Sequence, residues 1–400
     1  MLRSLRWPLL AYFLSLVLYS FLSYSLTDPN LVLSSWTPYW HWQQWMWQNI
    51  WQEPVKQTWL FGANFAFLFG SYFWLITAIQ SLKQSLNWKH VGLLIAICTA
   101  PLFFSYNALS HDVFNYIFNA KMVVTYHQNP HQHVALDFPD DTWIRFMHNT
   151  HTPAPYGYGW TVLSLIPYAF GVGKFTLTWL VFRGWNILAV AGVTWLLYQL
   201  FTLQHRKPKT EVLESFWRDV LIVMTNPLWL IEFVSNQHND LWMILPALAS
   251  LYFIWPRNEQ FQRRIPRIIL SFGLLALSIS TKLATLLLLP IWFFLLIGKL
   301  PKNWAFYCSL LLFIPLLTAR SQFFHPWYLS WAFVWLPFIK QKSWRTVLLA
   351  FSVTSLFRYL PWIWAGEYSD TVLQQQYFIT WSAALIGPLW FIWQQRKKTS

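Results

Sequence analysis

Long apolar runs, separated by short loops that contain Lys and Arg, make up most of this chain. A helix needs roughly 17–25 apolar residues to cross a bilayer, and fewer where other helices surround it. The pattern therefore predicts an all-α integral membrane fold with about 12 transmembrane helices, in a single polytopic domain over residues 1–400. The predicted spans are 7–26, 59–80, 90–109, 178–203, 219–235, 238–255, 268–281, 283–297, 304–319, 328–339, 345–359 and 377–394.

The composition excludes a soluble protein. Only 10% of the residues are charged and 56% are hydrophobic, whereas a soluble domain carries roughly 25% charged residues. The net charge of +14 does not indicate nucleic-acid binding, because the basic residues lie in short loops between apolar runs. We therefore expect membrane lipid, and no nucleic acid, around this protein.

The distribution of Lys and Arg predicts the topology. Most of the basic residues fall in alternate loops, as expected if those loops are cytoplasmic. This predicts a multi-pass protein of the plasma (inner) membrane with both termini in the cytoplasm. The prediction holds only if residues 157–172 do not cross. That segment is short and broken by Pro167, so we expect a juxtamembrane or re-entrant helix there, and residues 110–175 then form one long outer-face loop with juxtamembrane helices.

The stretch SHDVFNYIFNAKMVVTYHQNPH, residues 110–131, carries the first candidate site. Its apolar residues recur at helical spacing, which predicts a short amphipathic helix that lies along the bilayer surface and ends at Asn129-Pro130. Asp112 opens this helix. Spacing alone favours a helix cap, because Asp accepts hydrogen bonds from free N–H groups. The alternative is a carboxylate at the water–lipid boundary, and the two roles are compatible.

A polar segment interrupts the apolar run between residues 226 and 246. One interpretation is that these polar residues cap a helix start; they are Asn236, His238, Asn239 and Asp240. The other interpretation is a water-filled cavity, because polar side chains at bilayer depth are costly unless they line one. Glu232, two turns earlier within the apolar run, strengthens the cavity interpretation.

Four basic residues lie in or beside spans on the predicted outer side. A snorkelling membrane anchor is the simpler interpretation of each. Together they indicate an anion site, and phosphate is the anion that Arg and Lys match best. They are Arg183, Lys282, Arg320 and Arg358. Several His residues share the loop 111–151, but no HExxH pattern occurs, so we assign no metal ligands and keep a divalent cation as an open alternative.

In their order along residues 100–340, these motifs resemble the GT-C superfamily of integral-membrane glycosyltransferases, particularly the polyprenol-phosphate-mannose-dependent mannosyltransferases. The resemblance rests on the helix opened by Asp112, Pro155 to Trp160, His238-Asn239-Asp240, Thr281-Lys282 through Pro290, and His325 to Tyr328. Two positions depart from the family pattern: His131 replaces a usual tyrosine, and Tyr158-Gly159 interrupts a usual Pro-Leu.

The resemblance implies a GT-C-like fold and a hexosyltransferase, with Asp112 as general base at the outer face. The donor would be a polyprenyl-phosphate sugar, mannose or another hexose, and the acceptor a glycan or a lipid-linked sugar. A carboxylate can take the proton that an attacking hydroxyl loses, and cations stabilise the departing phosphate. The expected substrate-binding residues are His111, Asn129, Tyr156, Arg183, Glu232, His238, Asn239, Asp240, Lys282, Arg320, His325, Tyr328 and Arg358.

Two other classes of protein fit the same composition. A transporter or flippase for a lipid-linked sugar typically shows inverted repeats and broken helices at the bilayer midplane. The sequence shows no repeat, and its polar clusters fall on one side of the predicted membrane. A scaffold that binds lipid without chemistry is the third alternative.

Overall fold

A computed structural model of the chain describes residues 2–27, 33–82, 85–257, 261–317, 324–385 and 387–389. Within these ranges the regular structure is helical and no strand occurs. Five helices are long and apolar enough to cross a membrane. The predicted all-α fold is therefore confirmed for the described residues, and the apolar helices are consistent with a membrane protein.

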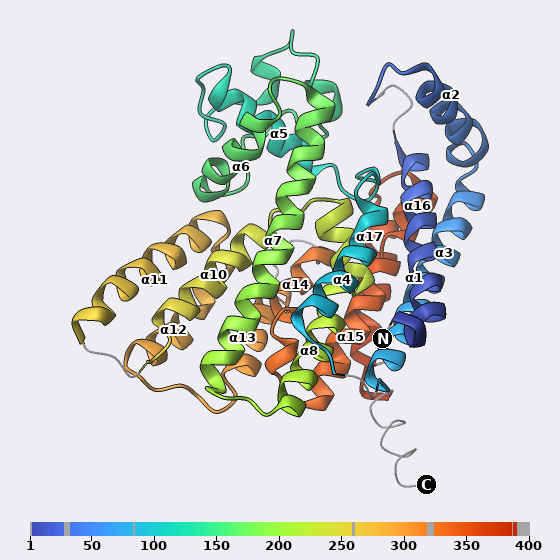
Figure 1. Cartoon of the computed structure of the whole chain (residues 1–400). Helices are drawn as coiled ribbons and strands as arrows, with labels where there is room; N and C mark the ends of the chain where they lie inside the picture. The colour runs from blue at the N-terminus through green and yellow to red at the C-terminus, as the bar shows by residue number, and fades with distance from the viewer. Residues whose placement is uncertain are drawn as a thin grey trace.

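The α-helices follow one another along the whole chain (Figure 1). The five longest are α1 (Leu2–Ser23), α3 (Pro54–Gln80), α7 (Phe175–Gln204), α11 (Phe261–Thr281) and α15 (Lys342–Phe357). The others are α2 (Thr37–Met46), α4 (Trp88–Thr99), α5 (Asp112–Val124), α6 (Tyr158–Phe170), α8 (Thr210–Met224), α9 (Pro227–Leu230), α10 (Leu241–Ile254), α12 (Leu289–Leu296), α13 (Trp304–Phe313), α14 (Leu329–Phe333), α16 (Leu360–Ala365) and α17 (Asp370–Trp381).

The count of about 12 spans is not confirmed and stays a prediction, because several predicted spans consist of shorter pieces. Residues 219–235 contain the end of α8, α9 and a π-helical turn, η6 (Ile231–Ser235). Residues 328–339 contain α14 and a 3-10 turn, η11 (Leu336–Phe338). Proline begins α9 and lies in η11, and it cannot continue a hydrogen-bonded helix. Interrupted backbone is tolerated in a membrane protein where protein surrounds it, and residues 220–244 are all buried.

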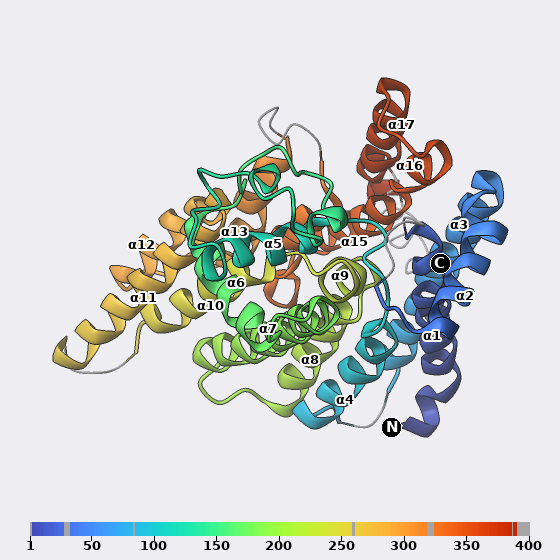
Figure 2. The same cartoon turned by 90° about the horizontal axis from the view of Figure 1, so that it is seen from above.

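The loop between α4 and α7 gathers with α5 and α6 at one end of the bundle, seen from the side in Figure 1 and from above in Figure 2. Helix α5 is enclosed by protein, and its expected position along the bilayer stays a prediction. Residues 113–120 are all buried, because α5 packs against α6 and α7 and because Phe114 stacks on Phe175. The helix also ends at Val124, before Asn129-Pro130.

Two glycines allow the start of α6 to approach the end of α11. The amide of Gly157 donates a hydrogen bond to the carbonyl oxygen of Thr281, 3.2 Å away. A Cβ atom on Gly157 would lie 1.8 Å from the carbonyl oxygen of Ser280, and one on Gly159 would lie 2.3 Å from the Ser280 hydroxyl. Only glycine fits this approach, which brings Tyr156 beside Lys282.

The polar segment at 236–240 is held in place by α7. The side-chain amide of Asn186 donates to the carbonyl oxygens of Phe233 and His238, at 3.0 and 3.1 Å. The guanidinium of Arg183 donates to the carbonyl oxygen of Ser235 at 3.0 Å. These bonds satisfy backbone groups that the break between η6 and α10 leaves without helical partners.

Candidate active site

Asp112 is the first residue of α5, and its side chain is 21% exposed. Its Oδ2 accepts hydrogen bonds from the hydroxyls of Tyr156, at 2.7 Å, and Tyr116, at 3.4 Å. The cap position of α5 is occupied by His111 and carries no side-chain cap bond, so the capping interpretation of Asp112 is wrong. Within the described part of the chain, Oδ1 of Asp112 has no partner and can receive a proton.

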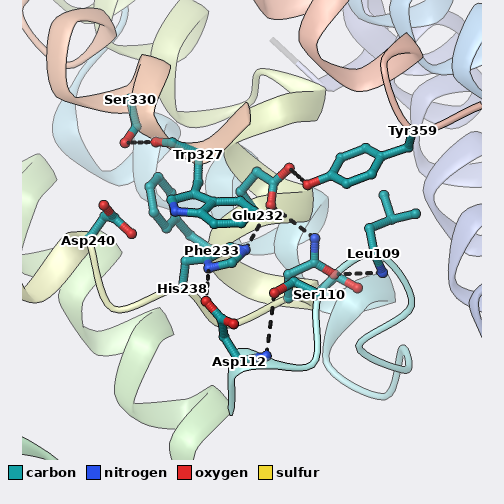
Figure 3. Close-up of polar contacts among 12 residues, drawn as sticks. Leu109, Ser110, Asp112, Glu232, Phe233, His238, Asp240, Trp327, Ser330 and Tyr359 are labelled. Atoms are coloured by element: carbon teal, nitrogen blue, oxygen red, sulfur yellow. Dashed lines mark hydrogen bonds and ion pairs between the residues drawn. The ribbon is translucent and has the colours of Figure 1, made fainter. Parts of the chain in front are cut away.

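The imidazole of His238 lies between two carboxylates (Figure 3). Its Nδ1 is 3.6 Å from Oδ2 of Asp112, and its Nε2 is 3.2 Å from Oε2 of Glu232. Both contacts are ion-pair distances rather than well-aligned hydrogen bonds. The ring is fully buried and stacks on Trp327, with the ring centroids 3.7 Å apart. A buried imidazole in this position is stabilised in its protonated form.

Glu232 faces protein groups rather than an open cavity. Its side chain is 1% exposed. Oε1 accepts a hydrogen bond from the Tyr359 hydroxyl at 2.9 Å, and Oε2 accepts one from Asn236 at 3.0 Å. Its further neighbour is His238, which lies between this carboxylate and Asp112.

The charges of these groups follow from their neighbours. Burial raises the pKa of the Asp112 carboxyl, but His238, Tyr156 and the Lys282 ammonium outweigh burial and hold that pKa well below its usual range. Burial lowers the pKa of His238, whereas Asp112 and Glu232 raise it, and the net direction is upward from 6.5. These directions favour an ionised carboxylate at Asp112 and the protonated form of His238. Burial lowers the pKa of His325 to about 4, which leaves that ring neutral at pH 7.

A second ion pair lies on the other side of Tyr156. The Lys282 ammonium donates to Oδ2 of Asp240 at 2.8 Å, and the indole of Trp331 donates to Oδ1 at 2.6 Å. The same ammonium lies 5.4 Å from the ring centre of Tyr156 and 5.6 Å from that of Tyr328. Tyr156 therefore contacts both the cation and Asp112.

Asn239, next to this pair, is fully buried. Neither its amide nitrogen nor its oxygen has a hydrogen-bond partner among the described residues. Buried polar groups are normally satisfied, so this amide is an exception within the site.

A cavity of about 730 Å³ opens beside Asp112. This volume lies in the range of small-molecule sites, which is roughly 300–1,000 Å³. Arg358, 6% exposed, lines the cavity and donates a hydrogen bond to the Thr380 hydroxyl at 3.1 Å. The other polar and aromatic residues of the wall include His111, Asn115, His148, His325, Trp327, Tyr359, Trp362 and Tyr368.

Two of the predicted residues, Arg183 and Asn129, are not brought to this site. Arg183 is fully buried and donates to the carbonyl oxygens of Phe103 and Ser235, so it holds backbone rather than facing the cavity. Asn129 bonds locally, accepting from the His131 amide and donating to the Tyr158 hydroxyl. Arg320 lies outside the described residues.

Sequence reasoning missed four residues that complete the site. Tyr116 follows Asp112 by one helical turn, and Tyr359 follows Arg358 directly. Trp327 lies within the His-Pro-Trp-Tyr motif, which could have pointed to it. Trp331 lies outside the motifs, and no sequence pattern pointed to it. Among the residues that the structure describes, no group of three or more His, Cys, Asp or Glu side chains is arranged to hold a metal ion.

Comparison with known families supports a glycosyltransferase of the GT-C type, and the apolar helices are consistent with a membrane protein. The family model described as "Alpha-(1->6)-mannopyranosyltransferase, N-terminal domain" matches residues 20–298, and the chain belongs to this family. The match includes Asp112, His238 and Lys282, and ends before His325. No curated protein and no solved structure matches the chain.

Proposed function

We propose that this protein transfers mannose, or another hexose, from a polyprenyl-phosphate donor to the hydroxyl of a glycan or lipid-linked acceptor, with Asp112 as general base. The single observation that carries the proposal is the placement of Asp112. Its carboxylate lies on the wall of a cavity of about 730 Å³ and is held ionised by Tyr156 and His238, with Oδ1 unpartnered among the described residues. The match to a mannopyranosyltransferase family favours mannose.

The reaction forms one bond and breaks another at the anomeric carbon of the sugar. The acceptor oxygen bonds to this carbon while its proton passes to Oδ1 of Asp112. The bond from the anomeric carbon to the phosphate oxygen breaks, and the electron pair leaves with the polyprenyl phosphate. A positioned carboxylate contributes typically 10²–10⁴-fold to such a step.

Negative charge develops on the departing phosphate, and two groups can stabilise it. Arg358 lines the cavity directly, and a guanidinium matches phosphate oxygens with two parallel hydrogen bonds. Lys282 is already paired with Asp240, so it acts from behind Tyr156 and shares its charge with that carboxylate. The aromatic wall formed by Trp362 and Tyr368 offers apolar surface to the polyprenyl chain.

The reaction would take place at the outer face of the plasma (inner) membrane. The basic loops at residues 206–209 and 340–345 join helix ends opposite to α5 and α6, and basic loops favour the cytoplasm. Nucleotide sugars are cytoplasmic substrates, whereas a flipped lipid carrier presents its sugar outside. A lipid donor therefore suits this location.

The donor class can be tested with the purified protein. We expect transfer of radiolabelled mannose from polyprenyl-phosphate mannose to a short mannoside acceptor, and no transfer from a nucleotide-linked mannose. Transfer from the nucleotide sugar alone would refute the proposed donor. Replacing mannose by glucose on the same polyprenyl phosphate tests which hexose the protein transfers.

A further inference from the structure

A second cavity, of about 850 Å³, lies away from Asp112. Helix α15 separates the two: Lys342, its first residue, lines the second cavity, and Arg358, which directly follows its last residue, lines the first. Sixteen residues of helix at 1.5 Å each span roughly 24 Å. The second cavity is therefore a separate site, at the end of the molecule that carries the basic loops.

The walls of this cavity are fixed by contacts between helices. The Tyr72 hydroxyl on α3 donates to the carbonyl oxygen of Ile222 on α8, at 2.7 Å. Arg345 on α15 forms a two-bond ion pair with Asp219 on α8, one bond at 2.8 Å. Five elements surround a hollow that their side chains do not fill, namely α3, α7, α8, η11 and α15.

The lining is divided into an apolar wall and a cationic rim. Phe73, Ile76, Phe216 and Leu349 supply aromatic and aliphatic surface. Lys340 and Lys342 are exposed at the rim, and neither has an ion-pair partner among the described residues. Arg206, Lys207 and Lys209 follow the lining residue His205 in the chain, but they do not line the cavity themselves. Asp219 is paired with Arg345, but Glu211 also lines the cavity. The charged lining residues without an ion-pair partner among the described residues are therefore Lys340, Lys342 and Glu211, and their net charge is +1.

We propose that this cavity binds an anionic phospholipid of the membrane leaflet that faces the basic loops. The phosphate-bearing head group would lie against Lys340 and Lys342, and an acyl chain would lie against the Phe73–Phe216 wall. A water-filled hollow needs no apolar wall, and a site for free phosphate needs no aromatic surface. An apolar wall together with a cationic rim matches an amphiphile with an anionic head group. Near a membrane surface each Lys adds about 1 kcal/mol of attraction to anionic lipid.

The proposal can be tested by native mass spectrometry of the purified full chain titrated with phosphatidylglycerol. The variant Lys340→Glu/Lys342→Glu reverses both rim charges, and we expect its phosphatidylglycerol affinity to fall by at least about tenfold. The matched control is Lys299→Glu/Lys302→Glu, which makes the same charge change at exposed lysines in a loop that does not line the cavity. The control should bind as the unmodified protein does.

Three further measurements separate the alternatives. Zwitterionic phosphatidylcholine should bind at least about tenfold more weakly than phosphatidylglycerol. Displacement of phosphatidylglycerol by millimolar inorganic phosphate would indicate a soluble-phosphate site and would overturn the proposal. An equal loss of phosphatidylglycerol affinity in both double variants, or no loss in either, would also overturn it. Asp112→Asn should leave lipid binding unchanged, so failure here is distinguishable from failure of the proposed sugar transfer.

Discussion

The amide of Gly157 lies 3.2 Å from the carbonyl oxygen of Thr281, and this bond ties α6 to the end of α11. It places Tyr156, which bonds Asp112, against Lys282. The close approach depends on the missing side chain, since a Cβ atom on Gly157 would lie 1.8 Å from a backbone oxygen.

Gly157→Ala is therefore expected to push α6 away from α11. Forcing a methyl group into such a contact costs about 1–3 kcal/mol, and the displaced Tyr156 should lower kcat more than it raises KM. Gly92→Ala in α4 is the matched control, because nothing lies within 4 Å of the added Cβ and alanine favours a helix. Thermal melting and sugar-transfer kinetics of both variants measure the effect. Full activity of Gly157→Ala would show that the approach is not required.

Glu232→Gln tests whether Glu232 acts through His238. The variant removes one of the two carboxylates that raise the pKa of His238, so that pKa should fall. If the imidazolium is the active form, activity is lost as pH rises through the His238 pKa, and this alkaline limb moves to lower pH in the variant. The measurement is kcat/KM against pH, from about 5 to 9.

The titration of His238 depends on the groups that face it. They are Asp112 on α5, Glu232 on η6 and, at longer range, His325. Glu53→Gln, at an exposed carboxylate before α3, serves as the control and should leave the profile unchanged. A Glu232→Gln profile that coincides with that of the unmodified protein would assign Glu232 a purely structural role.

Arg183 and Arg358 should respond oppositely to substitution. Arg183→Met leaves the carbonyl oxygens of Phe103 and Ser235 buried without their donor, which should lower the free energy of unfolding by about 3 kcal/mol. Arg358→Gln loses a cation from the cavity wall and should reduce kcat/KM at least tenfold, with little change in melting temperature. If the Arg183→Met variant is as stable as the unmodified protein but inactive, Arg183 binds substrate as the sequence predicted.

The sequence predicted those features that depend on neighbours in the chain. Apolar runs gave the helices, and the motif residues Asp112, His238 and Lys282 do lie close together, linked through Tyr156. Local patterns could identify polar side chains in costly places. They could not show which other groups those side chains contact.

The remaining features depend on contacts between distant segments. Glu232 lies between His238 and Tyr359, which comes more than a hundred residues later, so no local pattern could reveal that it is enclosed. Arg183 attracted interest as a charge in an apolar run, but its partners are two backbone carbonyls and the side chain of Asn107, and no local pattern reveals them. The burial of α5 likewise follows from packing by Phe175 and not from its own periodicity.

The topology can be tested with single cysteines. Both natural cysteines, Cys98 and Cys308, are buried, so the labelling background should be low. Cysteine at exposed Asp140, in the loop after α5, should react with a membrane-impermeant maleimide in intact cells. Cysteine at exposed Ser343, at the start of α15, should react only after permeabilisation. The reverse pattern would place the site in the cytoplasm.

The most direct measurement is sugar transfer and donor binding by purified Asp112→Asn. Asparagine keeps the shape of the side chain but cannot take a proton, so we predict a loss of turnover of about 10²-fold or more, with donor affinity within a few-fold of the unmodified protein. Transfer at the unmodified rate would contradict Asp112 as the base, and unchanged translocation of a lipid-linked sugar in place of transfer would favour a transporter.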